Sequence, residues 1–192
     1  MKHIAYSIML AALFSAPAQA EWTLNGEQST LSFVSTKAIN VAEAHKFAEL
    51  SGGVDASGQV SIVINLASVD TSIELRDERM REMLFETEQF ESATIGAKVD
   101  AAALAGLAAG QSLDVTVEGV LTLHGETRPL MMEIVVARSG DAQLLVMSRK
   151  PVIVNAPEFK LGEGVEALRE IAGLPSISLA VPVSFVLAFD AT

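Results

Sequence analysis

Few residues of this chain have the types and spacing that catalysis requires. The sequence contains no cysteine, which excludes thiol chemistry and thiolate metal sites. It has no Gly-x-Ser-x-Gly elbow, no phosphate-binding glycine loop, no His-Glu-x-x-His pair and no dinucleotide fingerprint. Its many carboxylates are typical of a solvated surface and do not by themselves define a metal site. We therefore expect no enzyme activity, no catalytic residue, no metal and no cofactor.

The side chains that remain chemically interesting are one histidine and a group of charges on a helix. His124 lies in a tight turn at 123–127, where it could contact a ligand headgroup or donate a proton; we expect a turn histidine that faces solvent. Arg76 and Arg81 could bind the polar headgroup of a ligand or form salt bridges that seat the helix. Asp77 is expected to seat the helix, whereas Arg76 and Arg81 are kept as candidate headgroup contacts.

The N-terminus predicts export. Lys2 precedes an apolar core at 4–14, and Ala18-Gln19-Ala20 forms a cleavage site before Glu21. A membrane anchor is the alternative, but about twenty apolar residues are needed to span a bilayer. We expect residues 1–20 to be a signal peptide cleaved after Ala20, and 21–192 to be one domain in the periplasm. A net charge of −11 repels phosphate groups, so nucleic acid is not an expected partner.

Period-two alternation of apolar and polar residues dominates the rest of the chain and predicts antiparallel strands. One apolar face each is expected for 31–35, 60–66, 112–123, 130–136, 143–149 and 177–189. A corner at Pro129 is expected before the fourth strand. Pro182 lacks a hydrogen-bond donor, so a bend, bulge or edge is expected in the last strand. Such long strands favour a barrel over a small sandwich.

Two short amphipathic helices interrupt the strands. Thr71 and Glu74 have the spacing of a capping box, which predicts a helix over 74–84. Apolar residues at helical spacing predict a second helix over 164–172, with Gly173 as its stop. The alanine-rich segment 101–110 is expected to be a helical turn or a loop. We expect the two helices to cap or flank the barrel.

Two segments resemble the motifs of the YceI-like family of bacterial lipid-binding barrels. The first comprises Ser68-Val69-Asp70-Thr71, Arg76-Asp77, Met80-Arg81, Phe85 and Phe90. The second comprises Gly119, Leu121, Thr122, Gly125, Thr127, Arg128 and Pro129. With Trp22 and the opening at 29–33, the likeness covers nearly the whole chain after the signal peptide. It implies a mainly β fold: an extended, lipocalin-like antiparallel barrel of about eight strands with two short helices.

The resemblance also implies a ligand, because the family's attributed cargo is a polyisoprenoid chain, including quinone-type and prenyl-phosphate lipids. We expect a periplasmic binding or carrier protein that holds such a lipid inside the barrel. The lining is expected on the apolar strand faces, although each of these residues could instead be packed core: Phe33, Ile62, Ile64, Val117, Leu121, Met132, Ile134, Val181, Val183 and Phe185.

Two other classes of protein remain open from the sequence. A lipid-modifying enzyme would use His124 with a nearby carboxylate. An outer-membrane barrel would also show alternating strands after a signal peptide, but the two internal helices and the single tryptophan oppose it. Besides a long-chain isoprenoid lipid, the sequence leaves open a homodimer and transient contact with the membrane or with a membrane redox protein.

Overall fold

The computed structural model describes residues 20–192. Apart from Ala20, the predicted signal peptide lies outside the described residues. Within them the chain forms a sheet of antiparallel strands: β1 (Ala20–Lys37), β2 (Val41–Phe47), β3 (Leu50–Asp55), β4 (Gln59–Asn65), β5 (Val69–Asp70), β6 (Ser92–Lys98), β7 (Ser112–Leu123), β8 (Glu126–Arg138), β9 (Gln143–Ser148), β10 (Val152–Asn155) and β11 (Ala180–Ala191).

Eight of these strands close into a barrel. Their order is β1-β3-β4-β6-β7-β8-β9-β11, and β11 pairs back with β1. The closing ladder runs from Trp22 opposite Ala191 to Phe33 opposite Val183. Because each of the eight strands pairs with two neighbours around the ring, the alternating strands can turn one side chain in two towards a shared interior. The predicted antiparallel barrel of about eight strands is confirmed.

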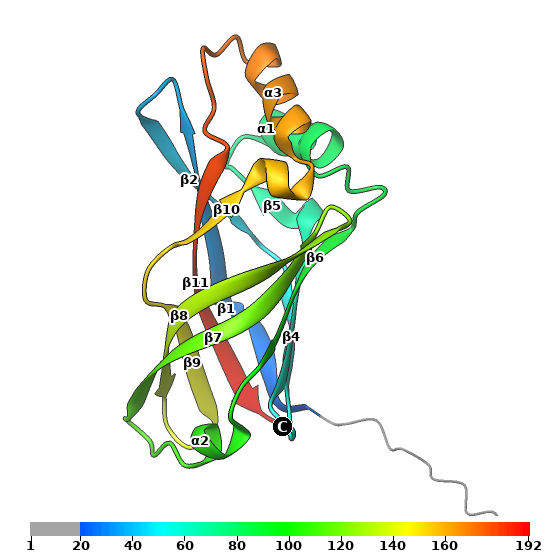
Figure 1. Ribbon diagram of the computed structural model, residues 1–192. Helices are drawn as coiled ribbons and strands as arrows, with labels where there is room; N and C mark the ends of the chain where they lie inside the picture. The colour runs from blue at the N-terminus through cyan, green and yellow to red at the C-terminus, as the bar shows by residue number, and fades with distance from the viewer. Residues whose placement is uncertain (1–19) are drawn as a thin grey trace, which may run out of the picture.

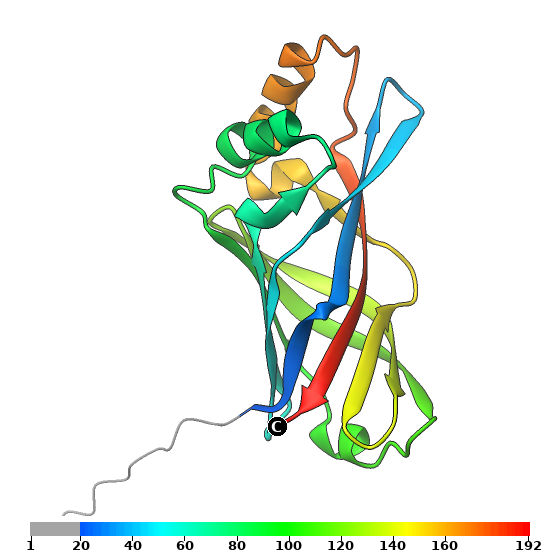
Figure 2. The same ribbon diagram turned by 180° about the vertical axis from the view of Figure 1, so that it is seen from behind.

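At one end the sheet extends beyond the closed ring. The upper half of β1 pairs with β2, which in turn pairs with β5, while the upper part of β11 pairs with β10. Helices α1 and α3 lie over this upper end, and α2 lies at the opposite, lower end (Figures 1 and 2). The molecule is therefore an elongated barrel with helices at both ends.

Both expected helices are present. α1 (Glu74–Arg79) continues into a wider π-helical turn (Met80–Leu84), and together they cover the expected range 74–84. α3 (Gly162–Ile171) begins two residues before the expected start. The alanine-rich segment 101–110, expected to be a helical turn or a loop, contains α2 (Ala101–Ala105), whose first turn is capped by the Asp100 side chain. Short 3₁₀ turns occupy Leu66–Ser68 and Ala156–Phe159.

The predicted capping box is wrong. The residue that precedes α1 is Ile73, and no side chain caps the helix there. Thr71 instead donates to Asp77 from its backbone N–H at 2.8 Å and also from its hydroxyl. A buried carboxylate in the helix therefore replaces the expected Glu74 as the partner of Thr71.

The predicted corner at Pro129 is also wrong. The chain turns at His124 and Gly125, whose φ angles of 51° and 75° are typical of a two-residue hairpin. β8 then runs through Pro129, which lies opposite Val120 of β7. Proline is tolerated because β9 pairs with β8 only from Ile134 onwards, so this part of β8 is an edge on its other side.

The last strand starts at Ala180 instead of Ile177. Its regular ladder with β1 ends at Val183, next to Pro182, and Ile177 meets β1 only through an isolated bridge to Lys37. The irregularity falls where the missing N–H of Pro182 predicts it.

Candidate ligand cavity

The interior of the barrel holds an upper and a lower chamber, and both are lined by apolar side chains. The upper chamber has an empty volume of about 940 Å³, including the space at its opening, and the lower one about 760 Å³. Leu84 and Val165 reach the upper chamber from the helical roof, whereas Leu104 of α2 reaches the lower one. An apolar wall of this kind suits a hydrocarbon ligand, because it offers no partner to a buried polar group.

The two chambers adjoin at a shared part of the wall, here called the waist. Four residues line both of them: Leu31, Ile95, Met132 and Phe185. Gly119 makes room for this waist, since a Cβ at that position would lie 3.0 Å from Cε of Met132 and 3.1 Å from the Gly96 carbonyl oxygen. A ligand that occupies both chambers must pass Met132, whose flexible thioether can adjust to it.

All ten residues expected to line the barrel are found in the walls of the chambers. Phe33, Ile64, Leu121, Val181 and Val183 line the upper chamber; Ile62, Val117 and Ile134 line the lower one; Met132 and Phe185 line both. Strand alternation therefore identified the inward side chains correctly. Their contact with a ligand remains a prediction.

The residues that roof the upper chamber were not predicted from the sequence. Leu84, Phe85, Leu161 and Val165 come from the ends of helices and from a connecting segment, so they belong to no alternating strand. Gly164 allows this close packing, because a Cβ there would lie 2.7 Å from the Met83 carbonyl oxygen. The apolar face of the predicted helix 164–172 was the available signal, but it did not indicate what the helix covers.

A seam runs along the side of the upper chamber. β8 is unpaired on one side before Ile134, and β10 pairs only with β11, so no backbone ladder joins β8 to β10. Leu130 and Val152 line both the upper chamber and a shallow outer pocket along this seam. A salt bridge of 2.6 Å between Lys150 and Glu133 lies at its edge. The side wall is therefore weakest between β8 and β10.

The inner face of the β1–β2 hairpin changes from apolar to polar towards its tip. Phe33 and Phe47 line the upper chamber, whereas His45 lies opposite Phe33 and Glu43 lies opposite Ser35. His45 is only 6% exposed, and its ring contacts that of Phe33 with centroids 5.3 Å apart. Burial, with the nearby Arg76 guanidinium, holds the pKa of His45 below its ordinary value.

Helix α1 covers this polar region with Arg76 and Asp77. The Arg76 guanidinium donates to Glu43 at 2.7 Å and to the Thr71 carbonyl at 2.6 Å. Hydrogen bonding from Lys37, and then from Arg76, lowers the pKa of Glu43. Asp77 is buried and accepts both hydrogen bonds from Thr71, so it seats the helix as expected.

Neither candidate headgroup arginine belongs to the wall of a chamber. Arg76 is bound to Glu43 and Thr71, and Arg81 donates to Glu74 at 2.9 Å across the outer surface of the helix. Arg76 nevertheless lies over the polar end of the β1–β2 hairpin, where it pairs with Glu43. Arg81 instead pairs with the exposed Glu74. Their role as headgroup contacts remains a prediction.

His124 does not face solvent, so that expectation is wrong. Its side chain is 10% exposed, its ring packs on Phe90 with centroids 4.2 Å apart, and its Nε2 lies 2.9 Å from a Glu86 carboxylate oxygen. The carboxylate partner that an enzyme would require is thus present. His124 is not part of either chamber wall, however, so this pair is separated from the space where a lipid would lie.

Residues 20–192 contain no group of three or more histidine or acidic side chains placed to hold a metal ion. In the same residues, no helix is both long and apolar enough to span a bilayer.

A closed barrel of eight strands with an apolar interior belongs to the class of barrels that can enclose one small apolar molecule. Residues 22–189 match the model of the YceI-like domain, and the chain is a member of the YceI-like family. The resemblance inferred from the sequence motifs is confirmed.

Solved structures agree with this assignment. A polyisoprenoid-binding domain from Saccharophagus degradans, implicated in plant cell wall breakdown, is 40% identical with a TM-score of 0.89 over 91% of this chain and 100% of that one. BcnA of Burkholderia cenocepacia shares the fold at 22% identity and a TM-score of 0.67, over 86% and 98% of the two chains. The YceI protein of Campylobacter jejuni shares it at 11% identity and a TM-score of 0.53, over 99% and 94%. A comparison with curated proteins gave no match.

Proposed function

We propose that this protein binds and carries a long apolar lipid of the polyisoprenoid type, held along the axis of the barrel. The observation that carries the proposal is the apolar space of two chambers joined at the waist of Leu31, Ile95, Met132 and Phe185. The 40% identical relative described as a polyisoprenoid-binding domain supports the same class of ligand.

The energetics favour binding without catalysis. Burying hydrocarbon contributes about 0.8 kcal/mol per methylene, so a few five-carbon units offset the cost of association and give about micromolar binding or better. The chambers present no nucleophile or acid–base pair to the ligand, and binding requires none. A carrier role, in which the lipid enters and leaves unchanged, requires only such an apolar wall.

The setting of the proposed function is the periplasm, where the signal peptide at 1–20 would deliver the protein. An apolar lipid needs a carrier in such an aqueous compartment. We expect loading through transient contact with the membrane or with a membrane redox protein that uses the lipid. A homodimer remains an open prediction.

The proposal is tested by native mass spectrometry of protein purified from the periplasmic fraction of its native cells. We expect an added mass that organic extraction removes and that added prenyl lipid restores. Leu121→Glu, which places a carboxylate in the wall of the upper chamber, should abolish the added mass. Val120→Glu is the matched control, because the neighbouring Val120 is exposed. Protein that is uniformly lipid-free and also ignores added prenyl lipids would contradict the proposal.

A further inference from the structure

We propose that the seam between β8 and β10 is the portal through which a hydrocarbon tail enters and leaves the upper chamber. This inference rests on the proposed function, because it assigns the route to the same cavity. It gives a role to two exposed apolar residues, Met131 and Ile153, that line neither chamber.

The first observation is that the backbone across the seam is unpaired. β10 pairs only with β11, and β9 pairs with β8 only from Ile134 onwards, so among the described residues no ladder joins β8 to β10. The Glu133 carbonyl oxygen accepts from the Arg149 N–H at 2.8 Å, so Glu133 and every second residue before it turn their backbone groups to the seam. Pro129 is one of these residues and has no N–H to offer. Separating β8 from β10 therefore breaks no backbone ladder.

The second observation is an apolar path across the seam. Met131 of β8 and Ile153 of β10 are 57% and 52% exposed, and both line the shallow outer pocket. Their neighbours Leu130 and Val152 line this pocket and the upper chamber as well. Single exposed apolar residues are common on protein surfaces, but these two lie where the adjacent side chains reach the cavity. A hydrocarbon tail that passes between the strands stays in contact with apolar side chains from the surface to the chamber.

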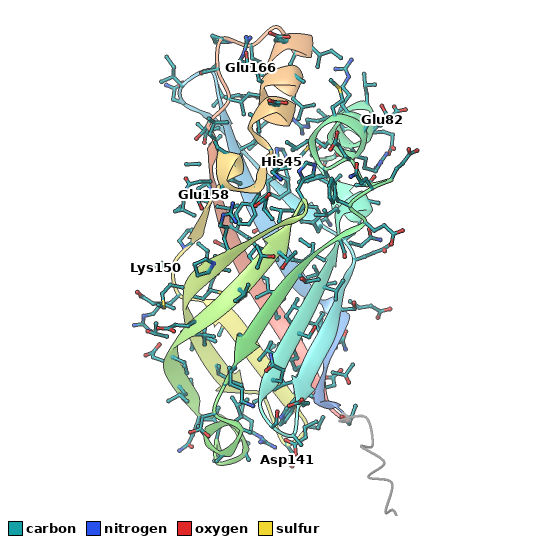
Figure 3. The ribbon with its side chains drawn as sticks, turned by 45° about the vertical axis from the view of Figure 1, so that its right-hand side comes forward. His45, Glu82, Asp141, Lys150, Glu158 and Glu166 are labelled. Atoms are coloured by element: carbon teal, nitrogen blue, oxygen red, sulfur yellow. The ribbon has the colours of Figure 1, made fainter. Side chains whose placement is uncertain are left out.

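The third observation is that exposed ion pairs cross the seam at both ends. Lys150 pairs with Glu133 at 2.6 Å at the lower end, and Lys160 pairs with Glu126 at 2.5 Å at the upper end. Both lysines are largely exposed, and Figure 3 shows Lys150 on the outer side of the barrel, below the helices. Hydrogen bonding from Lys160, and then from Arg128, lowers the pKa of Glu126, so this carboxylate is charged at neutral pH. Exposed ion pairs contribute little to stability, so they can hold the seam closed and still allow it to open.

The absence of cysteine from the sequence allows the seam to be locked chemically. In Glu126→Cys/Lys160→Cys the thiols replace two groups that are in contact, so a short bismaleimide can join them across the upper end of the seam. The probe is geranylgeraniol that carries an N-methylanthraniloyl fluorophore, and stopped-flow fluorescence follows its uptake and release by the delipidated mature protein. Joining the thiols should slow both rates roughly tenfold or more and leave the affinity unchanged, because only the barrier between free and bound states rises.

Two controls separate the portal from other effects of the cross-link. The unlinked form of the same variant shows what the substitutions do by themselves. Met147→Cys/Val186→Cys is the matched cross-link, because these residues lie opposite each other on β9 and β11, which are already paired. Its two rates should be the same with and without the bismaleimide.

The opposite change should make the seam open more often. Lys160→Glu places a like charge against Glu126 and should raise both rates roughly 2- to 5-fold. Arg149→Glu is the matched control, because it makes the same charge change in an exposed ion pair with Asp114 of β7, which does not cross the seam. Unchanged rates in Lys160→Glu would overturn the role of this ion pair in closing the seam.

The outcomes distinguish the portal from the proposed function. Rates that the cross-link at Glu126 and Lys160 leaves unchanged would overturn the portal, although lipid binding itself would stand. If the wild type takes up no probe, the proposed function fails, and the portal fails with it.

Discussion

At the residue scale, the buried His45 couples folding to pH. Its pKa is lowered in the folded state, by burial and by Arg76, whereas an unfolded histidine titrates near about 6.5. As pH falls through that value the unfolded chain therefore binds more protons than the folded one, so stability decreases. Lys37, Glu43, Arg76 and Asp77 are the charged groups that act on it. The lowered pKa of Glu43 adds a separate loss only below about pH 4.5.

We predict that His45→Phe flattens the loss of stability between about pH 7.5 and 5.5. The measurement is the urea midpoint of unfolding at several pH values in that window, for the wild type, the variant and the matched control Lys46→Met, on the outer face of the same strand. The wild type and Lys46→Met should both lose stability towards pH 5.5. Equal slopes for all three proteins would show that His45 does not titrate with folding.

Single residues show which side-chain positions can be predicted from the sequence and which cannot. Alternation placed Ile62, Val117 and Ile134 in the wall of the lower chamber, because a strand with one apolar face has one way to lie in a barrel. His124 was misplaced because its turn was expected to be exposed. Phe90 and Glu86, which cover it, follow a helix in a distant part of the chain. Burial that depends on such a tertiary contact leaves no local pattern.

At the element scale, the buried Asp77 anchors α1 to the segment that leads into it. This carboxylate accepts two hydrogen bonds from Thr71, and both residues are buried. We predict that Asp77→Ala lowers the free energy of unfolding by about 2–3 kcal/mol, because it leaves the Thr71 donors unpaired. The same variant should release a bound lipid faster, since the turn that follows α1 roofs the upper chamber through Leu84.

Chemical denaturation and stopped-flow lipid release check the two parts of this prediction. Glu78→Ala is the matched control, because Glu78 is the next residue of the same helix and is exposed. It should change the free energy of unfolding by less than about 0.5 kcal/mol. If Asp77→Ala behaves like Glu78→Ala, the helix is held by its apolar contacts instead.

Two strands that the sequence did not predict, β2 and β3, lack a clear alternating pattern for physical reasons. β3 contains Gly52 and Gly53, which interrupt the alternation; Gly52 has a φ of 133°, and a Cβ there would lie 2.0 Å from the Ser61 carbonyl oxygen. β2 places Glu43 and His45 on its inner face, so its pattern lacks a continuous apolar side. Close backbone packing in β3 and inward polar side chains in β2 thus replace the alternation of apolar and polar residues on which strand prediction depends.

At the scale of the whole molecule, closure of the barrel turns separate apolar strand faces into one enclosed space. Strands far apart in the chain, β1 and β11, form the closing ladder, and both contribute to the waist through Leu31 and Phe185. Neither the shared wall at the waist nor the presence of two chambers follows from any single strand. The family motifs predicted the barrel, but the division of its interior depends on how opposite walls meet.

This division predicts that the waist limits the length of ligand the protein can hold. Met132→Trp adds bulk where the chambers join, so a chain that fits the upper chamber should bind nearly as before, whereas a longer chain should lose the part that occupies the lower chamber. The matched control is Met131→Trp, the same change at the neighbouring outward position, which is 57% exposed. Overpacking at Met132 should also cost about 1–3 kcal/mol of stability, which thermal unfolding measures separately.

Dissociation constants for prenols of increasing length check the prediction. In the wild type and in Met131→Trp, affinity should rise by about 0.8 kcal/mol for each additional buried methylene until both chambers are filled. In Met132→Trp the rise should stop at a shorter length, because the added carbons stay outside the lower chamber. If affinity rises equally with length in all three proteins, the ligand does not pass the waist and is held by the upper chamber alone.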